Sequence, residues 1–310
     1  MKIKGFNLNE VNSFSLLLKN YSSIGIQATH LSQADEILEK IVKERECTFY
    51  LAFTSNIISS GLREIISQLI LLSKPSVIIT TAGAIEEDIM KSLSSFELGT
   101  FQADDKELRK KGINRIGNIY VSNDNYIALE EFIQPLLQEI YKKKKTISVN
   151  ELIKEISLKI KDKNLFLFSS LKSKTEVFCP AITDGALGVQ IYLFKQKHPD
   201  FCIDVSGDMK KLADITLLSK KTGALIIGGG LAKHHTIGVN LLRDGLDYAV
   251  YISTATEHDA SLSGAFPREA ISWGKLKQDS KHVLVNDEAS ISLPLLVLSL
   301  NEKIGKLNKK

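Results

Sequence analysis

The most unusual run of reactive side chains extends from Glu257 to Lys275 and holds the only tryptophan of the chain. Trp273 stands two residues before Lys275, and the carboxylate of Glu269 precedes both. A large aromatic ring removes water from a neighbouring amine, and a desolvated lysine keeps more of its neutral, nucleophilic form. Lowering a lysine pKa from ~10.4 to ~7 costs about 4–5 kcal/mol. The segment is therefore a candidate for attack on an imine or carbonyl carbon, with an ordinary solvated lysine as the alternative.

Three consecutive glycines, Gly228 to Gly230, follow an apolar run and precede a helical pattern. Glycine lets the backbone approach a ligand closely, and a helix start offers free N–H groups to a phosphate. The dinucleotide fingerprint GxGxxG is absent, because Lys233 stands where its third glycine would be. A phosphate-binding turn and a plain strand-to-helix turn both remain open.

Two further polar segments are ambiguous in the same way. Thr80-Thr81-Ala82-Gly83 leads into the acids Glu86-Glu87-Asp88, which we expect in the first turn of a helix, where the helix dipole favours them without any ligand. Thr54-Ser55-Asn56 suits a helix cap or a ligand contact equally well.

His234 and His235 are adjacent, so on a helix their side chains point about 100° apart and cannot both face one ligand. Paired metal ligands on a helix prefer a spacing of four residues. We expect no metal site here, and we expect one histidine at most to face a ligand.

The polar segments stand just after short apolar runs that alternate with longer amphipathic patterns. The runs predict strands at Thr48–Phe53, Ser76–Thr80, Asn118–Val121, Val177–Pro180, Cys202–Val205, Ala224–Ile227, Tyr248–Ile252 and His282–Val285. The patterns predict helices at Gly61–Ser73, Ile85–Leu93, Tyr126–Lys142, Val149–Lys161, Leu187–Lys197, Met209–Lys220 and Leu231–Arg243. Apolar strands that alternate with helices predict an α/β fold with a doubly wound, mainly parallel sheet covered on both faces. Ligands bind such sheets beyond the carboxyl ends of the strands.

The composition is that of an ordinary globular protein: 310 residues, 44% hydrophobic and 25% charged, with a net charge of +4. Part of the excess lies in Lys142–Lys145 and in the tail pair Lys309-Lys310, which does not indicate nucleic-acid binding. The three cysteines are far apart, which favours neither disulfides nor zinc. No leader pattern and no apolar run of 18 residues occurs, so we expect a cytoplasmic protein without a membrane span.

The domain organisation follows from the same patterns. We expect an N-terminal extension over residues 1–20, a single catalytic domain over 21–305 and a basic tail over 306–310. The charged stretch Lys142–Asn150 is interpreted as a surface loop inside that domain.

Taken in order, these segments resemble deoxyhypusine synthase. The resemblance covers roughly residues 20–300, and its Lys-His-His and Ser-Trp-Gly-Lys elements are specific. It rests on Ile24–Thr29, Thr54–Arg63, Thr80–Gly83 with Glu86–Asp88, Asn114–Asn118, Pro180–Gly185, Gly228–Gly230 with Lys233–His235, Asp247–Ile252, Ser261–Ala265 and Ala270–Lys275.

The resemblance implies an NAD-dependent transferase of archaeal type on a Rossmann-like fold. Such an enzyme moves a 4-aminobutyl group from spermidine, or from agmatine, onto one of its own lysines as an imine. The group then passes to a lysine of translation initiation factor 5A, the first step of hypusine formation. The resemblance further implies a homotetramer, a dimer of dimers with active sites at the dimer interface, and a reaction in which retained NADH makes the last reduction intramolecular.

Carried over by position, Lys275 is the covalent lysine, Trp273 and Glu269 line the amine tunnel, and His234 contacts the reacting amine and moves its proton. The implied NAD-binding residues are Asn56, Ser59, Thr81, Ala82, Gly83, Glu87, Asp184, Gly228, Gly229, Thr254, Ala255, Asp259, Ser263 and Glu288.

Four positions depart from the eukaryotic pattern of the family. Val189 and Leu262 stand where that pattern has amine-binding aspartates, Gly238 replaces an asparagine, and Glu288 replaces an aspartate near the cofactor. Each lost charge-assisted contact should weaken amine binding by about 1.5–3 kcal/mol. The donor therefore stays open, as do two alternatives: the same chemistry on a small-amine acceptor, as in homospermidine synthesis, and a non-catalytic NAD-binding partner subunit.

Overall fold

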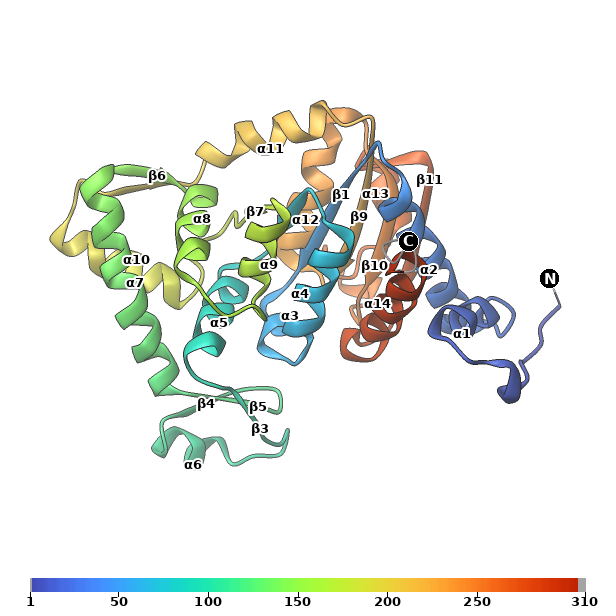
Figure 1. Ribbon diagram of the computed structural model, residues 1–310, viewed down its shortest axis with the longest axis horizontal. Coiled ribbons are helices and arrows are strands. Elements are labelled where there is room, and N and C mark those ends of the chain that lie inside the picture. Colours follow the sequence, from blue (N-terminus) through green and yellow to red (C-terminus); the bar gives the residue numbers. More distant parts are fainter. Residues whose placement is uncertain (1, 306–310) are drawn as a thin grey trace.

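The computed structural model describes residues 2–305, and within them a parallel sheet of six strands forms the centre of the molecule (Figure 1). The strand order is β11-β10-β9-β1-β2-β7. The bounds are β1 Cys47–Phe53, β2 Val77–Ile79, β7 Glu176–Phe178, β9 Lys221–Ile227, β10 Leu246–Ile252 and β11 Leu276–Val285. These strands confirm six of the predicted strands and the parallel sheet.

The chain passes through this sheet in two runs that start at its middle. It moves outward from β1 through β2 to β7, returns to β9 on the other side of β1, and moves outward again through β10 to β11. In β1, Leu51 pairs with Ile78 of β2 on one side and with Leu225 of β9 on the other. This is the doubly wound order of Rossmann folds, whose ligand crevice lies where the two runs diverge.

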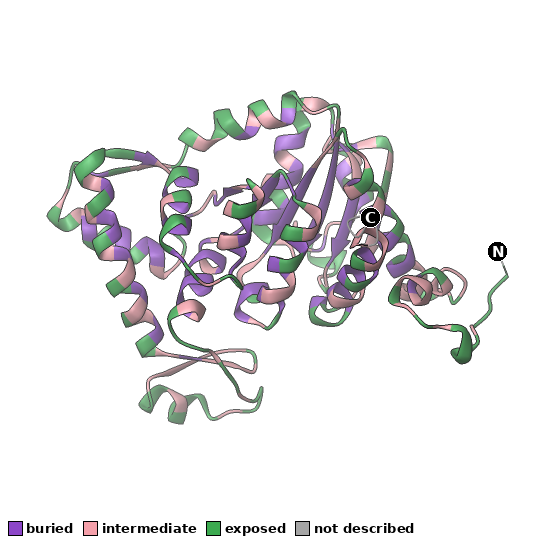
Figure 2. Ribbon diagram, in the orientation of Figure 1, coloured by how far each residue is buried: buried purple, intermediate pink, exposed green. Residues whose placement is uncertain are grey.

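Helices cover both faces of the sheet, as predicted, because side chains along each strand alternate between the faces. Leu51 and Phe53 join the larger core with the helices α2 (Ile26–Lys43), α4 (Leu62–Ser73), α9 (Phe166–Ser173) and α14 (Ala289–Gly305). Tyr50 and Ala52 join a smaller core with α11 (Gly207–Leu217), α12 (Gly230–Val239) and α13 (Pro267–Ser272). Figure 2 shows the inner strands of the central sheet, such as β1 and β9, buried along most of their length.

The first run contains most of the remaining helices. They are α3 (Ser55–Ser59), α5 (Ala82–Leu93), α7 (Asn123–Lys143), α8 (Val149–Lys159) and α10 (Ala186–Lys197). Three 3-10 turns lie at Leu8–Glu10, Asn240–Arg243 and Glu257–Asp259.

Two predicted strands form outside the central sheet. β5 (Ile119–Ser122) lies in an antiparallel arm with β3 (Glu97–Leu98), β4 (Ile113–Ile116) and the helix α6 (Asp105–Lys110), which projects from the body in Figure 1. A tight turn at Gly117, with a φ of +60°, joins β4 to β5, so this pairing is local. β8 (Cys202–Asp204) pairs with β6 (Thr146–Ser148) in a separate parallel pair.

The interpretation of Lys142–Asn150 as a surface loop was wrong. The stretch holds the end of α7, the strand β6 and the start of α8. Ile147 and Val149 are each only 1% exposed, and Ser148 forms a reciprocal capping box with Glu151. Apolar residues among the lysines therefore anchor this stretch in the core.

The first and last α-helices of the described residues pack together beside the sheet. Helix α1 (Phe14–Tyr21) packs against α14, whose Glu302 accepts N–H groups from Phe14 and Ser15 at 3.0 and 2.8 Å. The expected boundary at residue 20 thus falls inside α1, and the expected tail over 306–310 lies outside the described residues. No helix in residues 2–305 is long and apolar enough to cross a membrane.

Candidate active site

The turns after β1 and β9 come into direct contact where the two runs of the sheet diverge. Gly228 has a φ of +86°, and a Cβ placed there would lie 2.7 Å from Oγ1 of Thr54. Gly229 is as crowded, since its Cβ would lie 2.6 Å from Oγ of Ser263. The three-glycine run therefore serves close backbone approach in this fold, at the crevice where Rossmann folds bind dinucleotides.

The start of α5 joins this crevice from the end of β2. A Cβ on Gly83 would lie 2.8 Å from the Ser55 Cβ, so α5 and α3 begin side by side. Thr81 precedes α5 without capping it, and its Oγ1 is buried without a hydrogen-bond partner among the described residues. A buried hydroxyl without a partner, beside a helix start without a side-chain cap, fits an anionic group such as the pyrophosphate of a dinucleotide.

The three acids of α5 lie in its second turn and point into the protein, which corrects the expectation of a first turn stabilised by the dipole. The helix begins at Ala82, three residues earlier than predicted. Ser59 donates to Glu87, and burial raises the pKa of Glu87 to about 7. This pair joins two of the implied cofactor residues in one contact.

The other two acids bind helix starts that are remote in sequence. Glu86 accepts the N–H of Leu187 at 2.7 Å, at the start of α10, and burial raises its pKa. Asp88 accepts the N–H of Leu167 at 3.0 Å, at the start of α9, and burial raises its pKa to about 8. The residues before these helices, Leu165 and Gly185, provide no side-chain cap. Their caps come from α5, which sequence reasoning did not foresee.

The remaining implied cofactor residues lie after their strands as expected. Asn56, Asp184 and Thr254 are exposed, and Ala255 is half-buried. Asp259 accepts the N–H of Ser261 at 2.8 Å, which lowers its pKa, and Ser263 Oγ accepts the N–H of Gly230 at 3.0 Å. Glu288 accepts the N–H of Ser290 at 2.9 Å in the first turn of α14, so in this chain it stabilises a helix start.

A cavity of about 300 Å³ lies between α12, the segment after Glu257 and α13. Five of the predicted reactive and amine-binding residues line it: Lys275, Glu269, Trp273, His234 and Leu262. The structure thus brings together side chains from three separate parts of the last third of the chain.

Lys275 directly precedes β11, and hydrogen bonds hold its backbone on both sides. Its N–H donates to the Ala270 carbonyl at 2.9 Å, and its carbonyl accepts from the N–H of Leu246 at 3.1 Å. Its Nζ lies 5.1 Å from the centroid of the Trp273 ring. The ring itself is 65% exposed, so Trp273 contacts the amine without enclosing it.

The two adjacent histidines divide as predicted, with one at the cavity. His234 lines the cavity and is exposed to it, whereas His235 is half-buried outside the lining. Burial, together with the neighbouring His234, lowers the pKa of His235. Because the two adjacent side chains point apart, only His234 is placed to transfer a proton in the cavity.

Two expected amine-binding positions lie outside the cavity lining. Val189 is on α10, beyond the opposite run of the sheet, and is 54% exposed. Gly238 lies one turn beyond His234 on α12, where a Cβ would meet nothing within 4 Å.

The lining also includes Lys233, which the sequence marks by its place in the Lys-His-His element and in the interrupted glycine pattern, without a predicted role. Its side chain is 2% exposed, and burial lowers its pKa to about 8. Its position directly before the two histidines was the signal that could have identified it.

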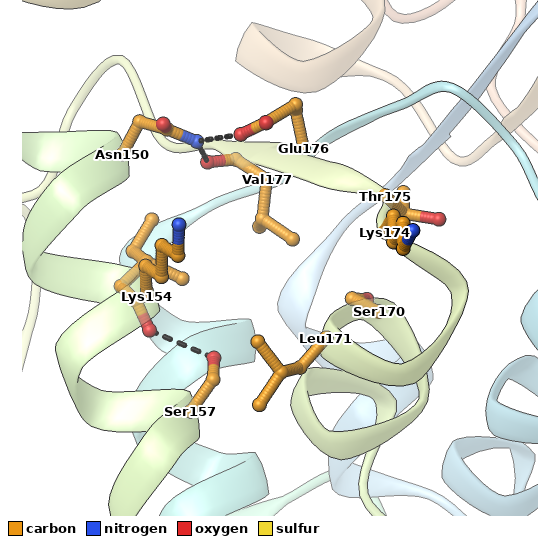
Figure 3. Close-up of a pocket in the computed structure, with 10 residues that line it drawn as sticks. Asn150, Lys154, Ser157, Ser170, Leu171, Lys174, Thr175, Glu176 and Val177 are labelled. Carbon is orange, nitrogen blue, oxygen red and sulfur yellow. Dashed lines mark hydrogen bonds between the residues drawn. The ribbon is translucent and has the colours of Figure 1, made fainter.

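A second cavity, of about 310 Å³, lies between α8, α9 and the edge strand β7 (Figure 3). Asn150 in this lining is paired within the chain: its Nδ2 donates to Glu176 at 3.1 Å and to the Val177 carbonyl at 2.9 Å. None of the predicted site residues lines it. These contacts satisfy the outer edge of the sheet and leave the first cavity as the candidate site.

Comparison with known proteins identifies the family. The deoxyhypusine synthase family model matches residues 16–300. The chain is 43% identical to proteins named probable deoxyhypusine synthase in Pyrococcus abyssi, over 96% of this chain and 93% of that one, and in Methanocaldococcus jannaschii, over 93% of each. A relative of the same name in Dictyostelium discoideum is 39% identical, over 98% of this chain and 87% of that one.

A solved structure agrees with the fold described above. The crystal structure of a deoxyhypusine synthase from Entamoeba histolytica matches with a TM-score of 0.70 at 26% identity, over 96% of each chain. Sequence, site and fold lead to the same conclusion: the chain belongs to the deoxyhypusine synthase family.

Proposed function

We propose that this protein transfers a 4-aminobutyl group from spermidine or agmatine, using NAD, to a specific lysine of translation initiation factor 5A in the cytoplasm. The observation that carries the proposal is the cavity that groups Lys275, Glu269 and His234 beside the glycine turn after β9. Membership of the family supports the acceptor.

The crevice between β1 and β9 fits NAD. The unpartnered hydroxyl of Thr81 and the N–H groups at the start of α5 would hold its phosphates, and Gly228 and Gly229 leave room for its approach. The implied residues Asn56, Ser59, Glu87, Asp184, Thr254, Ala255, Asp259 and Ser263 complete that binding set. When bound, NAD supplies a hydride acceptor and later returns the hydride.

Each cavity residue has a task that its chemistry allows. The Glu269 carboxylate holds an ammonium group of the donor, and a ring nitrogen of His234 accepts the proton that the reacting amine releases. The Lys275 amine attacks the donor's imine carbon, and diaminopropane leaves when spermidine is the donor or guanidine leaves when agmatine is the donor. The aminobutyl fragment thereby becomes an imine of Lys275. The acceptor lysine then displaces Lys275 at that same carbon.

The charge of the cavity supports assembly into the implied homotetramer. Lys233 and Lys275 face a single carboxylate, Glu269, among the lining residues. A donor with several ammonium groups needs further carboxylates, and a second copy at a dimer interface would supply them.

Leu262 in the lining keeps a second candidate in view. Leu262 has no charge with which to hold an ammonium group of a polyamine, and it is compatible with a small-amine acceptor, as in homospermidine synthesis. The acceptor decides between the two functions.

The test is to incubate the purified protein with NAD and either spermidine or agmatine, trap with borohydride and measure the intact mass. We expect an aminobutyl adduct that maps to Lys275, that requires NAD and that is absent from Lys275→Arg. The donor that forms the adduct is the substrate. Addition of the translation factor or of putrescine before trapping shows which acceptor discharges the adduct. NAD binding without an adduct from either donor would favour a non-catalytic partner subunit.

A further inference from the structure

Lys233 places a lysine amine where each of its three hydrogens has a partner. Nζ donates to the Ala265 carbonyl at 2.6 Å and to the Ser263 carbonyl at 3.4 Å, and it lies 4.8 Å from the centroid of the Tyr251 ring. The side chain is 2% exposed, and within residues 2–305 it forms no ion pair. Two carbonyls and one ring face match the three donors of an ammonium group.

The two carbonyls belong to Ser261–Ala265, which we call the dividing segment. On one side, Ser263 Oγ accepts the N–H of Gly230 at the glycine turn of the cofactor crevice. On the other side, Leu262 and Ala265 line the amine cavity. The segment therefore lies between the glycine turn and the amine cavity.

At Gly264 the dividing segment packs so closely against the backbone of Thr256 that only glycine fits. A Cβ on Gly264 would lie 1.6 Å from the Thr256 carbonyl oxygen. At the neighbouring residues Ser263 and Ala265, the amine of Lys233 holds the carbonyl groups of the segment. A segment fixed by both contacts has little freedom to change the distance between crevice and cavity.

We propose that Lys233 is a positioning residue: its buried ammonium group holds the dividing segment so that the amine donor and the cofactor lie at the separation that hydride transfer requires. This inference rests on the proposed function. Hydride transfer is steep in distance, so a small displacement of the dividing segment would slow the first half-reaction.

The same contacts separate the tasks of the two cavity lysines. The amine of Lys233 is occupied by its carbonyl acceptors, whereas that of Lys275 has no hydrogen bond among the described residues and contacts only the Trp273 ring. Lys275 is free to attack carbon, and Lys233 is not.

The experiment compares Lys233→Met, Lys233→Arg and the control Lys172→Met, an exposed lysine on α9. Hydrogen–deuterium exchange of residues 257–266 is measured without donor. The kcat and KM for NADH formation from the donor, and the Kd of NAD, are measured separately. For Lys233→Met we expect the exchange rate of residues 257–266 to rise about 10- to 100-fold and kcat/KM to fall by a similar factor, through kcat more than through KM. The Kd of NAD should change less than about threefold.

Lys233→Arg keeps a cation with several donors, so we expect it to keep slow exchange and to restore part of kcat. It also serves as the test variant if Lys233→Met does not fold. Unchanged exchange and kcat in Lys233→Met, or a donor adduct on Lys233 when Lys275 is replaced by Arg, would overturn the assignment. If the wild-type protein forms no NADH with either donor, the proposed function fails, and the exchange measurement alone still decides whether Lys233 holds the segment.

Discussion

The two runs of the sheet contribute to the site in different ways. In the first run, β1-β2-β7, the polar groups behind the crevice are buried and paired within the chain: Glu87 with Ser59, and Asp88 with the start of α9. In the second run, β9-β10-β11, the side chains that follow the strands are largely exposed, including Asp259 and Trp273. Folding alone pairs these buried acids of the first run and leaves Asn56, Asp184 and the Thr81 hydroxyl available there, whereas the second run keeps most of its polar groups available.

A lysine holds a site segment on each side, half-buried at Lys91 and buried at Lys233, which makes the contrast sharper. Lys91 of α5 donates to the carbonyls of Ile58 and Ser60 at 2.9 and 2.6 Å and so ends α3. Lys233 of α12 does the same for the dividing segment. Burial lowers the pKa of both amines. Substitutions in the first run should therefore change stability, and substitutions in the second should change activity.

The largest expected effect is on the second side. Lys275→Ala removes the amine that forms the imine, so transfer to the acceptor should fall by at least about 1,000-fold. The backbone contacts of residue 275 remain, so NAD affinity and the unfolding temperature should stay unchanged. Mass spectrometry of the acceptor measures transfer, and retained transfer would refute the role of Lys275.

The next effect is on the first side and depends on pH. Burial raises the pKa of Asp88 from 3.8 to about 8, against the lowering influence of Arg63 and Lys91. Between these values the unfolded chain releases a proton that the folded chain keeps, so stability falls as the pH rises. Asp88→Asn removes this dependence.

Between pH 5 and pH 8 the wild type should therefore lose on the order of 3 kcal/mol in free energy of unfolding that Asp88→Asn does not lose. Denaturant unfolding of both proteins at these two pH values measures the difference. Parallel stability curves would mean that Asp88 does not titrate in this range.

A smaller effect distinguishes Leu262 from Val189, the two positions at which this chain lacks an aspartate of the eukaryotic pattern. Leu262 lines the cavity, so Leu262→Asp should tighten spermidine binding about 10- to 100-fold. Val189 lies outside it, so Val189→Asp should leave the affinity of a single copy unchanged and should tighten binding only in an oligomer whose second copy brings α10 to the cavity. Calorimetric titration, with the oligomeric state measured in parallel, separates these outcomes. No change from Leu262→Asp would remove that residue from the donor site.

The smallest effect is at the boundary between the runs. Gly228→Ala places a Cβ against Thr54 at a φ of +86°, which should cost about 1–2 kcal/mol and weaken NAD binding by about tenfold. Gly238→Ala is the matched control, because its Cβ meets nothing within 4 Å on a helix, where alanine is favoured. Equal NAD affinity in the two variants would argue against a close approach of the cofactor to Gly228.

Local pattern was enough for the strands of the central sheet and for several helices, but it missed β6 and did not give the strands' partners. The strands around Leu51 and Leu225 and the helices after them follow from apolar runs and periodicity, which are properties of neighbouring residues. The strand at Cys202 was predicted as readily, yet it pairs with β6 outside the central sheet. A strand's sequence does not state which edge it joins.

By itself the sequence determined the order of strands and helices, the glycine turn at Gly228 and the closeness of Trp273 to Lys275, because each depends on residues near one another in the chain. Only the tertiary structure decided that Asp88 and Glu86 hold helices whose starts lie 79 and 101 residues away. It also decided that Lys233 is buried against two carbonyls and that Val189 lies apart from the cavity. Burial and long-range hydrogen bonds depend on which surfaces pack together, and no local pattern contains that information.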